Sequence, residues 1–152
     1  MIRFAPHDPA RIRRDLRQRL AQGGPTLQFP GALSPLVARA IEDAGFAGVY
    51  LSGGALSAEL GMPDVGLTTL SEVTDRARRV ATATSLPTIV DADTGFGEAL
   101  NAARTVQELE RAGVAGCHLE DQENPKRCGH LAGKRLVDPA EMERTVRAAA
   151  AA

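Results

Sequence analysis

Apolar residues recur at helical spacing in several segments of the chain, and most of these segments open with residues that cap helices. The predicted helices begin at Asp8-Pro9, Ser34-Pro35, Thr69 and Asp138, and a further helix spans residues 98–112. An Asp, Ser or Thr side chain accepts a hydrogen bond from the first turn of a helix, and proline suits its first position. Glu72 and Glu141 follow Thr69 and Asp138 at the spacing of a capping box.

The spacing also predicts which face of each helix is buried. The expected core positions are Ile12, Leu16 and Leu20 in the first helix; Leu36, Val37, Ala40, Ile41 and Ala44 in the second; Leu70, Val73, Ala77 and Val80 in the third; and Leu100, Ala103, Val106 and Leu109 in the fourth. Glycines follow several of these helices and predict where they end.

Short β-branched or apolar runs alternate with the helices. Strands are predicted at residues 27–31, 46–52, 87–90 and 114–119, whereas residues 55–68 are expected to be irregular because Gly61, Pro63 and Gly66 interrupt any period. Strands that alternate with helices indicate parallel pairing, so the predicted class is α/β.

An internal repeat narrows the fold. Residues 44–52 (AGFAGVYLS) align with residues 112–120 (AGVAGCHLE), which indicates a repetitive strand–helix array such as the (β/α)₈ TIM barrel. A complete barrel takes about 250 residues, so the expectation is one incomplete domain over residues 1–152 that supplies the N-terminal half, about four βα units. Residues 1–24 would form the N-terminal helix segment, and residues 25–152 the βα units with a lid loop at 120–135.

Composition limits the possible functions. With 43% hydrophobic residues and a net charge of −1, the chain has an ordinary globular composition without the basic excess of a nucleic-acid-binding protein. Residues 1–9 lack the apolar core of a signal peptide, and no run approaches the length of a membrane span. Two cysteines are too few for a disulfide scaffold and favour a cytoplasmic location.

Polar residues gather where the predicted strands end. Asp91 and Asp93 are two residues apart and therefore share one face of their strand. The repeat aligns Glu120 with Ser52, and Tyr50, two residues before Ser52, shares the face of Ser52. Barrel enzymes keep their active sites at this end of the strands. Converging carboxylates repel one another unless a cation lies between them, and Mg²⁺ suits oxygen ligands. The alternative is that these acids only cap the loops that follow.

Three other positions have two interpretations each. Ser52-Gly53-Gly54 follows a strand and could present backbone N–H groups to an anion, or could form a plain turn. Asp64 lies in a turn-rich loop and is either a turn former or a site residue. Cys117 has the parity opposite to Glu120, which favours a place in the core.

The loop at residues 120–130 places Lys126, Arg127 and His130 around Cys128. Neighbouring positive charge favours thiolate over thiol, and Gly129 allows the backbone to approach a ligand. A basic surface loop with an incidental cysteine is the alternative.

Several motifs together resemble the isocitrate lyase/phosphoenolpyruvate mutase superfamily. They are residues 50–54 (YLSGG), 61–64 (GMPD), 90–97 (VDADTGFG), 118–122 (HLEDQ) and 126–130 (KRCGH). The last motif is specific to the cysteine-bearing lyase branch. This resemblance implies a small-molecule enzyme that cleaves 2-methylisocitrate into pyruvate and succinate, as in the methylcitrate cycle of propionate catabolism. Cleavage of isocitrate or dimethylmalate, or carboxyphosphonoenolpyruvate mutase chemistry, are alternatives within the superfamily.

The resemblance also implies residue roles. Asp91 would bind Mg²⁺ directly, Asp93 largely through water, and Glu120 in the same shell. The loop formed by Ser52, Gly53 and Gly54 would bind the α-oxyacid end of the substrate. Asp64, Cys128 and Gly129 would contact the substrate. Tyr50 is the candidate base and Cys128 the proton donor. His130 and Lys126 would tune the pKa of the Cys128 thiol.

The complete family enzyme is expected to be a homo-oligomer, with neither nucleic acid nor membrane as a partner. The competing interpretation of the chain is an inactive half-barrel that serves only in binding or assembly.

Overall fold

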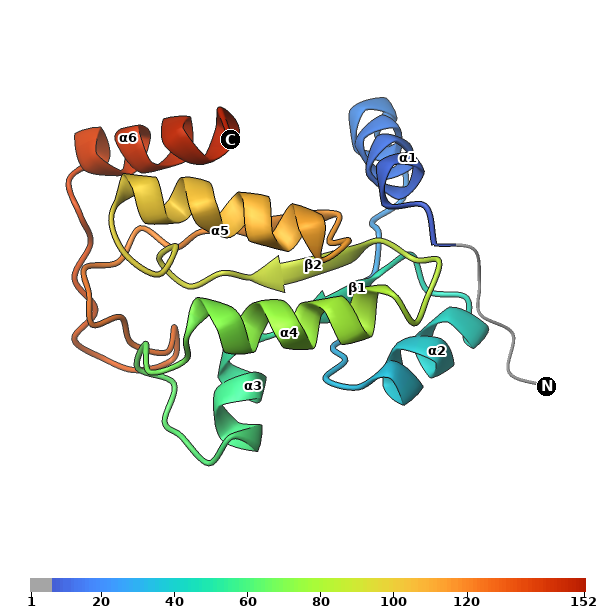
Figure 1. Ribbon diagram of the computed structural model, residues 1–152, viewed down its shortest axis with the longest axis horizontal. Helices are drawn as coiled ribbons and strands as arrows, with labels where there is room; N and C mark the ends of the chain where they lie inside the picture. The colour runs from blue at the N-terminus through green and yellow to red at the C-terminus, as the bar shows by residue number, and fades with distance from the viewer. Residues whose placement is uncertain (1–6) are drawn as a thin grey trace.

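A three-stranded parallel sheet lies at the centre of the computed structural model, which describes residues 7–152 (Figure 1). The strands are β1 (Val49–Leu51), β2 (Thr88–Asp91) and β3 (Gly116–His118), in the order β1-β2-β3. Each strand is followed by a helix, so the predicted α/β class with parallel pairing is confirmed. Residues 1–6, assigned above to the N-terminal segment, lie outside the described residues.

The predicted strand at 27–31 is wrong as a regular element. Gly31 alone pairs with Tyr50, in an isolated parallel bridge, while the Tyr50 amide donates to the Pro30 carbonyl and the Ala32 amide donates to the Tyr50 carbonyl, each at 2.9 Å. Proline has no N–H to donate, so Pro30 interrupts a continuous ladder. The segment therefore runs beside β1 without becoming a full strand.

The helices largely follow their predicted starts and stops. They are α1 (Pro9–Gln22), α2 (Pro35–Asp43), α3 (Gly53–Glu59), α4 (Leu70–Ala81), α5 (Ala99–Arg111) and α6 (Pro139–Ala150). The expectation of irregular structure from residue 55 is wrong, because residues 53–59 form α3. The Ser52 hydroxyl caps this helix by accepting from the Ala55 amide at 3.2 Å. Its seven residues are too few and too small to produce a readable stripe.

One of the two predicted capping boxes forms. In α4 the Thr69 amide donates to Glu72 at 2.7 Å, and the Glu72 amide donates to the Thr69 hydroxyl at 3.3 Å. The predicted box of α6 is wrong, because the Asp138 side chain makes no capping hydrogen bond and the Glu141 amide donates to the main-chain carbonyl of Asp138 instead.

The predicted buried face is right for α4 and only partly right for α2 and α5, where Ile41 and Leu109 are buried as predicted. Val73, Ala77 and Val80 are buried, but Leu36 and Leu100 are 78% and 84% exposed. In α2 the buried residues are Ala38 and Ile41, and in α5 they are Ala102, Thr105 and Leu109. The Thr105 hydroxyl donates to the Gly95 carbonyl at 3.0 Å. Small residues on this face of α5 let it approach the turn after β2, which explains why the larger Leu100 faces outward.

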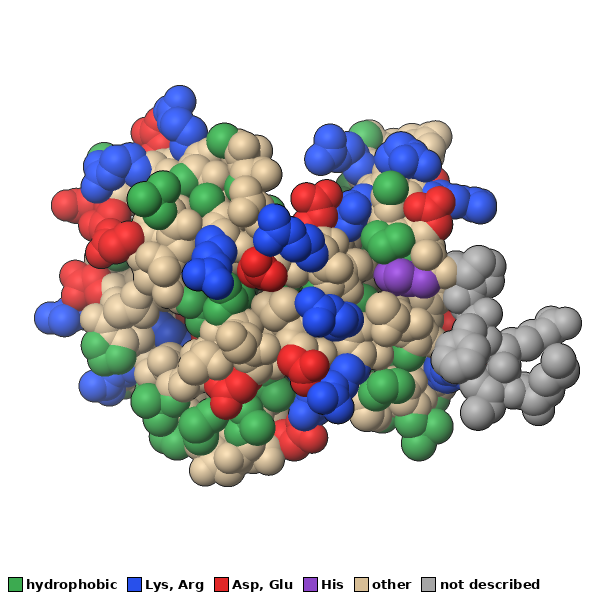
Figure 2. All heavy atoms as spheres, viewed as in Figure 1, with side chains coloured by type: hydrophobic (Ala, Val, Ile, Leu, Met, Phe, Trp, Pro, Cys, Tyr) green, Lys and Arg blue, Asp and Glu red, His purple; other side chains and the backbone are tan. Residues whose placement is uncertain are grey.

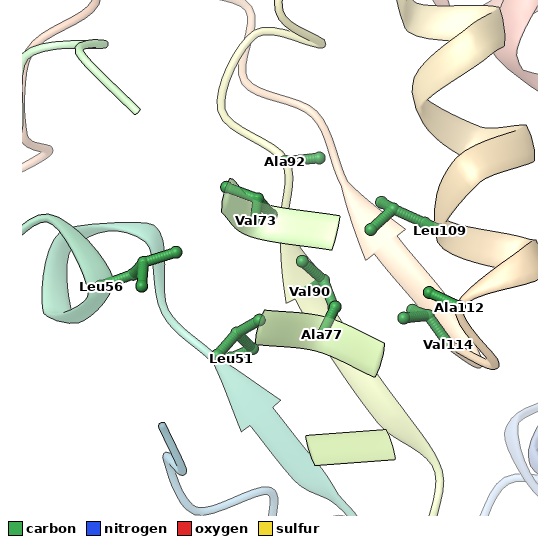
Figure 3. Close-up of a cluster of buried hydrophobic side chains, with 9 residues drawn as sticks. All are labelled: Leu51, Leu56, Val73, Ala77, Val90, Ala92, Leu109, Ala112 and Val114. Carbon is green, nitrogen blue, oxygen red and sulfur yellow. The ribbon is translucent and has the colours of Figure 1, made fainter. Parts of the chain in front are cut away.

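The core lies on the face of the sheet that α4 and α5 cover. Its buried members, drawn in Figure 3, are Leu51, Leu56, Val73, Ala77, Val90, Ala92, Leu109, Ala112 and Val114. Cys117 packs against this cluster, as its strand parity predicted, and burial raises the pKa of its thiol. The core fixes which strand side chains point to the helices and therefore which point to the opposite face.

Charged side chains of both signs are interspersed with apolar ones on the face of the molecule shown in Figure 2. Within residues 7–152, no helix combines the length and apolar character needed to cross a bilayer.

Candidate active site

The residues that carry the predicted carboxylates lie at the carboxyl ends of β2 and β3. Asp91 is the last residue of β2, and its Oδ1 accepts from the Asp93 amide at 3.2 Å. The Glu120 amide, two residues beyond β3, donates to the Asp93 carbonyl at 2.7 Å. These main-chain links bring the loops after the two strands together, as expected for parallel strands.

Tyr50, Asp91 and His118 lie on the sheet face opposite the core. Strand register pairs Asp91 with His118, and the Tyr50 and His118 rings stack with their centroids 5.8 Å apart. The His118 Nε2 lies 3.2 Å from Asp91 Oδ1 and 3.4 Å from the Tyr50 hydroxyl. The predicted parity is confirmed for these strand residues. His118 had no predicted role, although the repeat aligned it with Tyr50.

Negative charge dominates the electrostatics of this face. Burial, together with the nearby Asp91 and Glu120 carboxylates, raises the pKa of Tyr50 to about 12. Burial opposes ionisation of Asp91, yet the hydrogen bond with His118 and the amides of Asp93 and Gly53 lower its pKa. The same hydrogen bond raises the pKa of His118. His118 therefore stabilises the ionised form of Asp91 through this hydrogen bond.

Lys126 is the buried cation of the site. Its side chain is 2% exposed, and Nζ lies 2.5 Å from Asp64 Oδ1 and 2.6 Å from Asp93 Oδ1. Burial opposes its charge, but its bonds to both carboxylates raise the pKa of Lys126. Burial and the neighbouring Asp91 and Asp64 nevertheless raise the pKa of Asp93. The predicted substrate residue Asp64 thus joins the site through Lys126.

Cys128 stands beside this ion-paired cluster. It is half-buried, and its amide donates to the Asp64 carbonyl at 3.0 Å. Gly129 and His130 are exposed. The sequence predicted that Lys126 acts on the Cys128 thiol, but in the structure its ammonium contacts two carboxylates. The role of Lys126 as a link between loops was not visible in the sequence.

Ser52, Gly53 and Gly54 form the cap and first turn of α3. The Gly53 amide donates to Asp91 Oδ2 at 3.1 Å. A Cβ at Gly53 would lie 3.0 Å from Asp91 Oδ2, and one at Gly54 would lie 3.0 Å from Asp64 Oδ2. A side chain at either position would crowd these carboxylates, so the two glycines ease the close approach of α3 to the acidic residues.

Gln122 was not singled out by sequence reasoning. Its side chain is buried, donates to Glu120 Oε2 at 2.7 Å, and pairs with both main-chain groups of Arg127. Nothing in the spacing of the motifs distinguishes Gln122 from a polar loop residue, so only the structure reveals these contacts.

The donor set at the strand ends fits a hard divalent cation. In residues 7–152 no group of three or more His, Cys, Asp or Glu residues converges closely enough to hold an ion, so the three carboxylates do not form a direct ligand triad. Magnesium commonly uses one or two carboxylates and several waters. Burial and neighbouring carboxylates raise the pKa values of both Asp93 and Glu120. A cation at this place would relieve that repulsion.

Two cavities adjoin the cluster. One of about 490 Å³ is lined by residues that include Glu120, Gln122 and Thr94. Another of about 720 Å³ is lined by residues that include Asp93, Lys126 and Thr68. Glu120 therefore lines one cavity and Asp93 lines the other.

Comparison with known proteins identifies the family. The family model for phosphoenolpyruvate phosphomutase matches residues 16–152. A protein from Corynebacterium glutamicum named "Probable 2-methylisocitrate lyase 2" is 60% identical over 142 residues, which are 93% of this chain and 46% of that protein. The chain spans about half the length of the curated relatives it matches.

Solved structures show the same fold. The crystal structure of 2,3-dimethylmalate lyase, described as a PEP mutase/isocitrate lyase superfamily member, has a TM-score of 0.86 and 39% identity, over 92% of this chain and 47% of that one. Phosphonopyruvate hydrolase, solved with oxalate and Mg²⁺, has a TM-score of 0.82 and 35% identity, over 91% of this chain and 47% of that one. The predicted barrel-type fold, of which this chain covers about half, is confirmed by these matches. The motifs, the fold and the family model together place this chain in the phosphoenolpyruvate mutase family.

Proposed function

We propose that this chain carries the metal-binding and proton-donating part of a Mg²⁺-dependent carbon–carbon lyase that cleaves 2-methylisocitrate into pyruvate and succinate. This proposal rests mainly on the contacts of the loop that bears Cys128: it is joined to Asp64 by the Cys128 amide and by Lys126, and Lys126 also contacts Asp93 in the turn after β2. The 60% identity to a protein named as a probable 2-methylisocitrate lyase supports the choice of substrate.

In this proposal Asp91 would hold the metal directly, Asp93 would hold it largely through water, and Glu120 would belong to the same shell. When bound, Mg²⁺ supplies Lewis acidity to the hydroxyl and carboxylate oxygens of the substrate. A similar structure, that of phosphonopyruvate hydrolase, was solved with Mg²⁺ and oxalate, which supports the choice of metal.

The chain's own residues would move the protons. A base takes the proton of the substrate hydroxyl, and Tyr50 is the candidate because it lies on the same face of the sheet as Asp91 and contacts His118, which is bonded to Asp91. With a pKa of about 12 the phenol of Tyr50 is protonated at neutral pH, and a divalent cation nearby would lower that pKa. His118, 3.4 Å from the hydroxyl, would orient Tyr50.

Breaking the carbon–carbon bond leaves an electron pair on the succinate fragment, which must be protonated on carbon. Cys128 as thiol would donate that proton and become a thiolate. Ser52, Gly53 and Gly54 would bind the α-oxyacid end of the substrate, so the hydrogen bond from the Gly53 amide to Asp91 would have to be exchanged. Gly129 and Asp64 would contact the substrate near Cys128.

A second candidate is a binding or assembly module without turnover of its own. The observation that favours it is the open sheet face, on which the His118 side chain is 45% exposed. In a whole family enzyme, residues that this chain does not contain would cover such a face, and that enzyme is proposed to be a homo-oligomer.

Pyruvate release from 2-methylisocitrate separates these candidates. The chain is assayed with and without Mg²⁺, both alone and mixed with the part of the Corynebacterium relative that it does not cover. Mg²⁺-dependent release that Asp91→Asn abolishes and the exposed Asp43→Asn leaves intact supports the lyase. Release in neither arm, from folded protein, would reject it and favour the module.

A further inference from the structure

The loop that carries Cys128 has a closed base. The Glu123 amide donates to the Arg135 carbonyl at 2.9 Å, and the Val137 amide donates to the Asp121 carbonyl at 3.0 Å. Gln122 and Leu136 form an antiparallel bridge between these bonds. The main chain of Gln122 is therefore held where the loop begins and ends.

The side chain of Gln122 spans the interior of this loop. Its Oε1 accepts from the Arg127 amide at 3.0 Å, and its Nε2 donates to the Arg127 carbonyl at 2.9 Å. A side-chain amide that meets both main-chain groups of one residue fixes the position and orientation of that peptide. Cys128 is the next residue in the chain.

The second proton on Nε2 goes to Glu120 Oε2 at 2.7 Å. The amide thus makes three hydrogen bonds, while its residue is only 7% exposed. A buried amide satisfied in this way has one favourable orientation, because rotating it by half a turn would set its NH₂ against the Arg127 amide and its oxygen against the Glu120 carboxylate.

We propose that Gln122 is the positioning residue that couples the Glu120 carboxylate to the peptide carrying Cys128. Glu120 and Cys128 belong to opposite ends of the proposed chemistry, the metal shell and the proton donor. Gln122 fixes their relative positions because one side-chain amide is hydrogen-bonded both to Glu120 and to the peptide before Cys128. The inference rests on the proposed function for the meaning of these two residues, but the coupling itself requires neither metal nor substrate.

The test is a double-mutant cycle read out by alkylation of Cys128 with iodoacetamide, resolved by peptide mass spectrometry. Gln122→Met keeps the length of the side chain and removes all three hydrogen bonds. Because water replaces part of what is lost, the net cost should be that of about one to two hydrogen bonds. We therefore expect the labelling rate of Cys128 to rise by roughly five- to thirtyfold. Cys117 reports global loosening in the same molecules, and its labelling should stay unchanged. Gln107→Met, on the exposed side of α5, is the matched control.

Glu120→Ala is then combined with Gln122→Met. The proposal predicts that Glu120→Ala speeds labelling in the parent chain but has little further effect when Gln122 is Met. Independent, multiplicative effects would overturn the coupling, as would labelling of Cys128 within about twofold of the parent in folded Gln122→Met. If Gln122→Met loses its helical circular dichroism, Gln122→Glu takes its place under the same criteria, because it keeps the acceptor for Arg127 and loses both donors.

The labelling cycle runs without Mg²⁺ or substrate. Absence of pyruvate release with an intact cycle would reject the proposed function and leave the coupling standing. Release of pyruvate together with independent, multiplicative effects on labelling would support the proposed function and reject the coupling.

Discussion

The ammonium of Lys126 lies 2.6 Å from Oδ1 of Asp93, inside a region where the lysine side chain is only 2% exposed. A second carboxylate, Asp64, lies on its other side. One lysine of the Cys128 loop therefore joins the loop before α4 to the turn after β2. This link orders the site before any ligand binds.

Lys126→Met should destabilise the fold by about 3–5 kcal/mol, because it leaves two carboxylates without their cation in a buried place. Urea unfolding measures the change. Lys134→Met is the matched control, since Lys134 is exposed and donates only to the Gly129 carbonyl. Adding Asp93→Asn to Lys126→Met should restore part of the loss. Equal stability of Lys126→Met and Lys134→Met would contradict the ion pair.

Cys128→Ser should lower pyruvate release by roughly 10²–10⁴-fold with little change in stability, because a serine hydroxyl is a far weaker acid than a thiol. Cys117→Ser should show the opposite pattern, a loss of about 1–3 kcal/mol in stability with turnover retained, because it places a hydroxyl against the apolar core. The assay and an unfolding curve are needed for both variants. A Cys128→Ser protein that turns over normally would remove the cysteine from the mechanism.

Gly95→Ala should be more damaging than Gly61→Ala. Both glycines have positive φ, +91° and +73°, but a Cβ at Gly95 would lie 2.9 Å from the Ala102 Cβ, whereas one at Gly61 meets nothing within 4 Å. The φ cost of about 1–2 kcal/mol applies to both, and crowding adds about 1–3 kcal/mol at Gly95 alone. Thermal unfolding of the two variants separates these effects, and equal losses would argue against close packing of α5 on this turn.

Glu42 should make stability depend on pH. Burial opposes its charge, but hydrogen bonds from Ser85 and Thr84 lower its pKa. A carboxyl whose folded pKa is depressed stabilises the fold above its unfolded pKa, and this contribution is lost as pH falls through the folded value. Glu42→Gln should therefore lose stability at pH 7 and differ less from the parent in acid, by urea unfolding. The exposed Glu141→Gln is the control, and an equal loss in acid and at neutrality would contradict this origin.

Local regularities explain which parts of the fold could be predicted. Side chains alternate along any strand and the repeat aligns Tyr50 with His118, so the common face of these two residues could be predicted. The caps at Ser34 and Thr69 act within one turn of helix, and both are present. These features need no knowledge of what packs against them.

The features that sequence could not reveal depend on distant partners. Lys126 and Asp64 are 62 positions apart in the sequence. Neither of their motifs indicates that Lys126 contacts a carboxylate instead of the neighbouring Cys128. The buried face of α5 was only partly predicted, because close packing on Gly95 favours Ala102 and Thr105 over the larger Leu100. The contacts of Gln122 depend in the same way on how its loop folds back.

The account depends most on the claim that the carboxylates at the strand ends hold a divalent cation. Titration calorimetry of this chain with Mg²⁺ tests it without needing turnover. The predicted result is a single binding site that Asp91→Asn removes and the exposed Asp43→Asn preserves. Absence of Mg²⁺ binding by the folded parent chain, or undiminished binding by Asp91→Asn, would contradict the account.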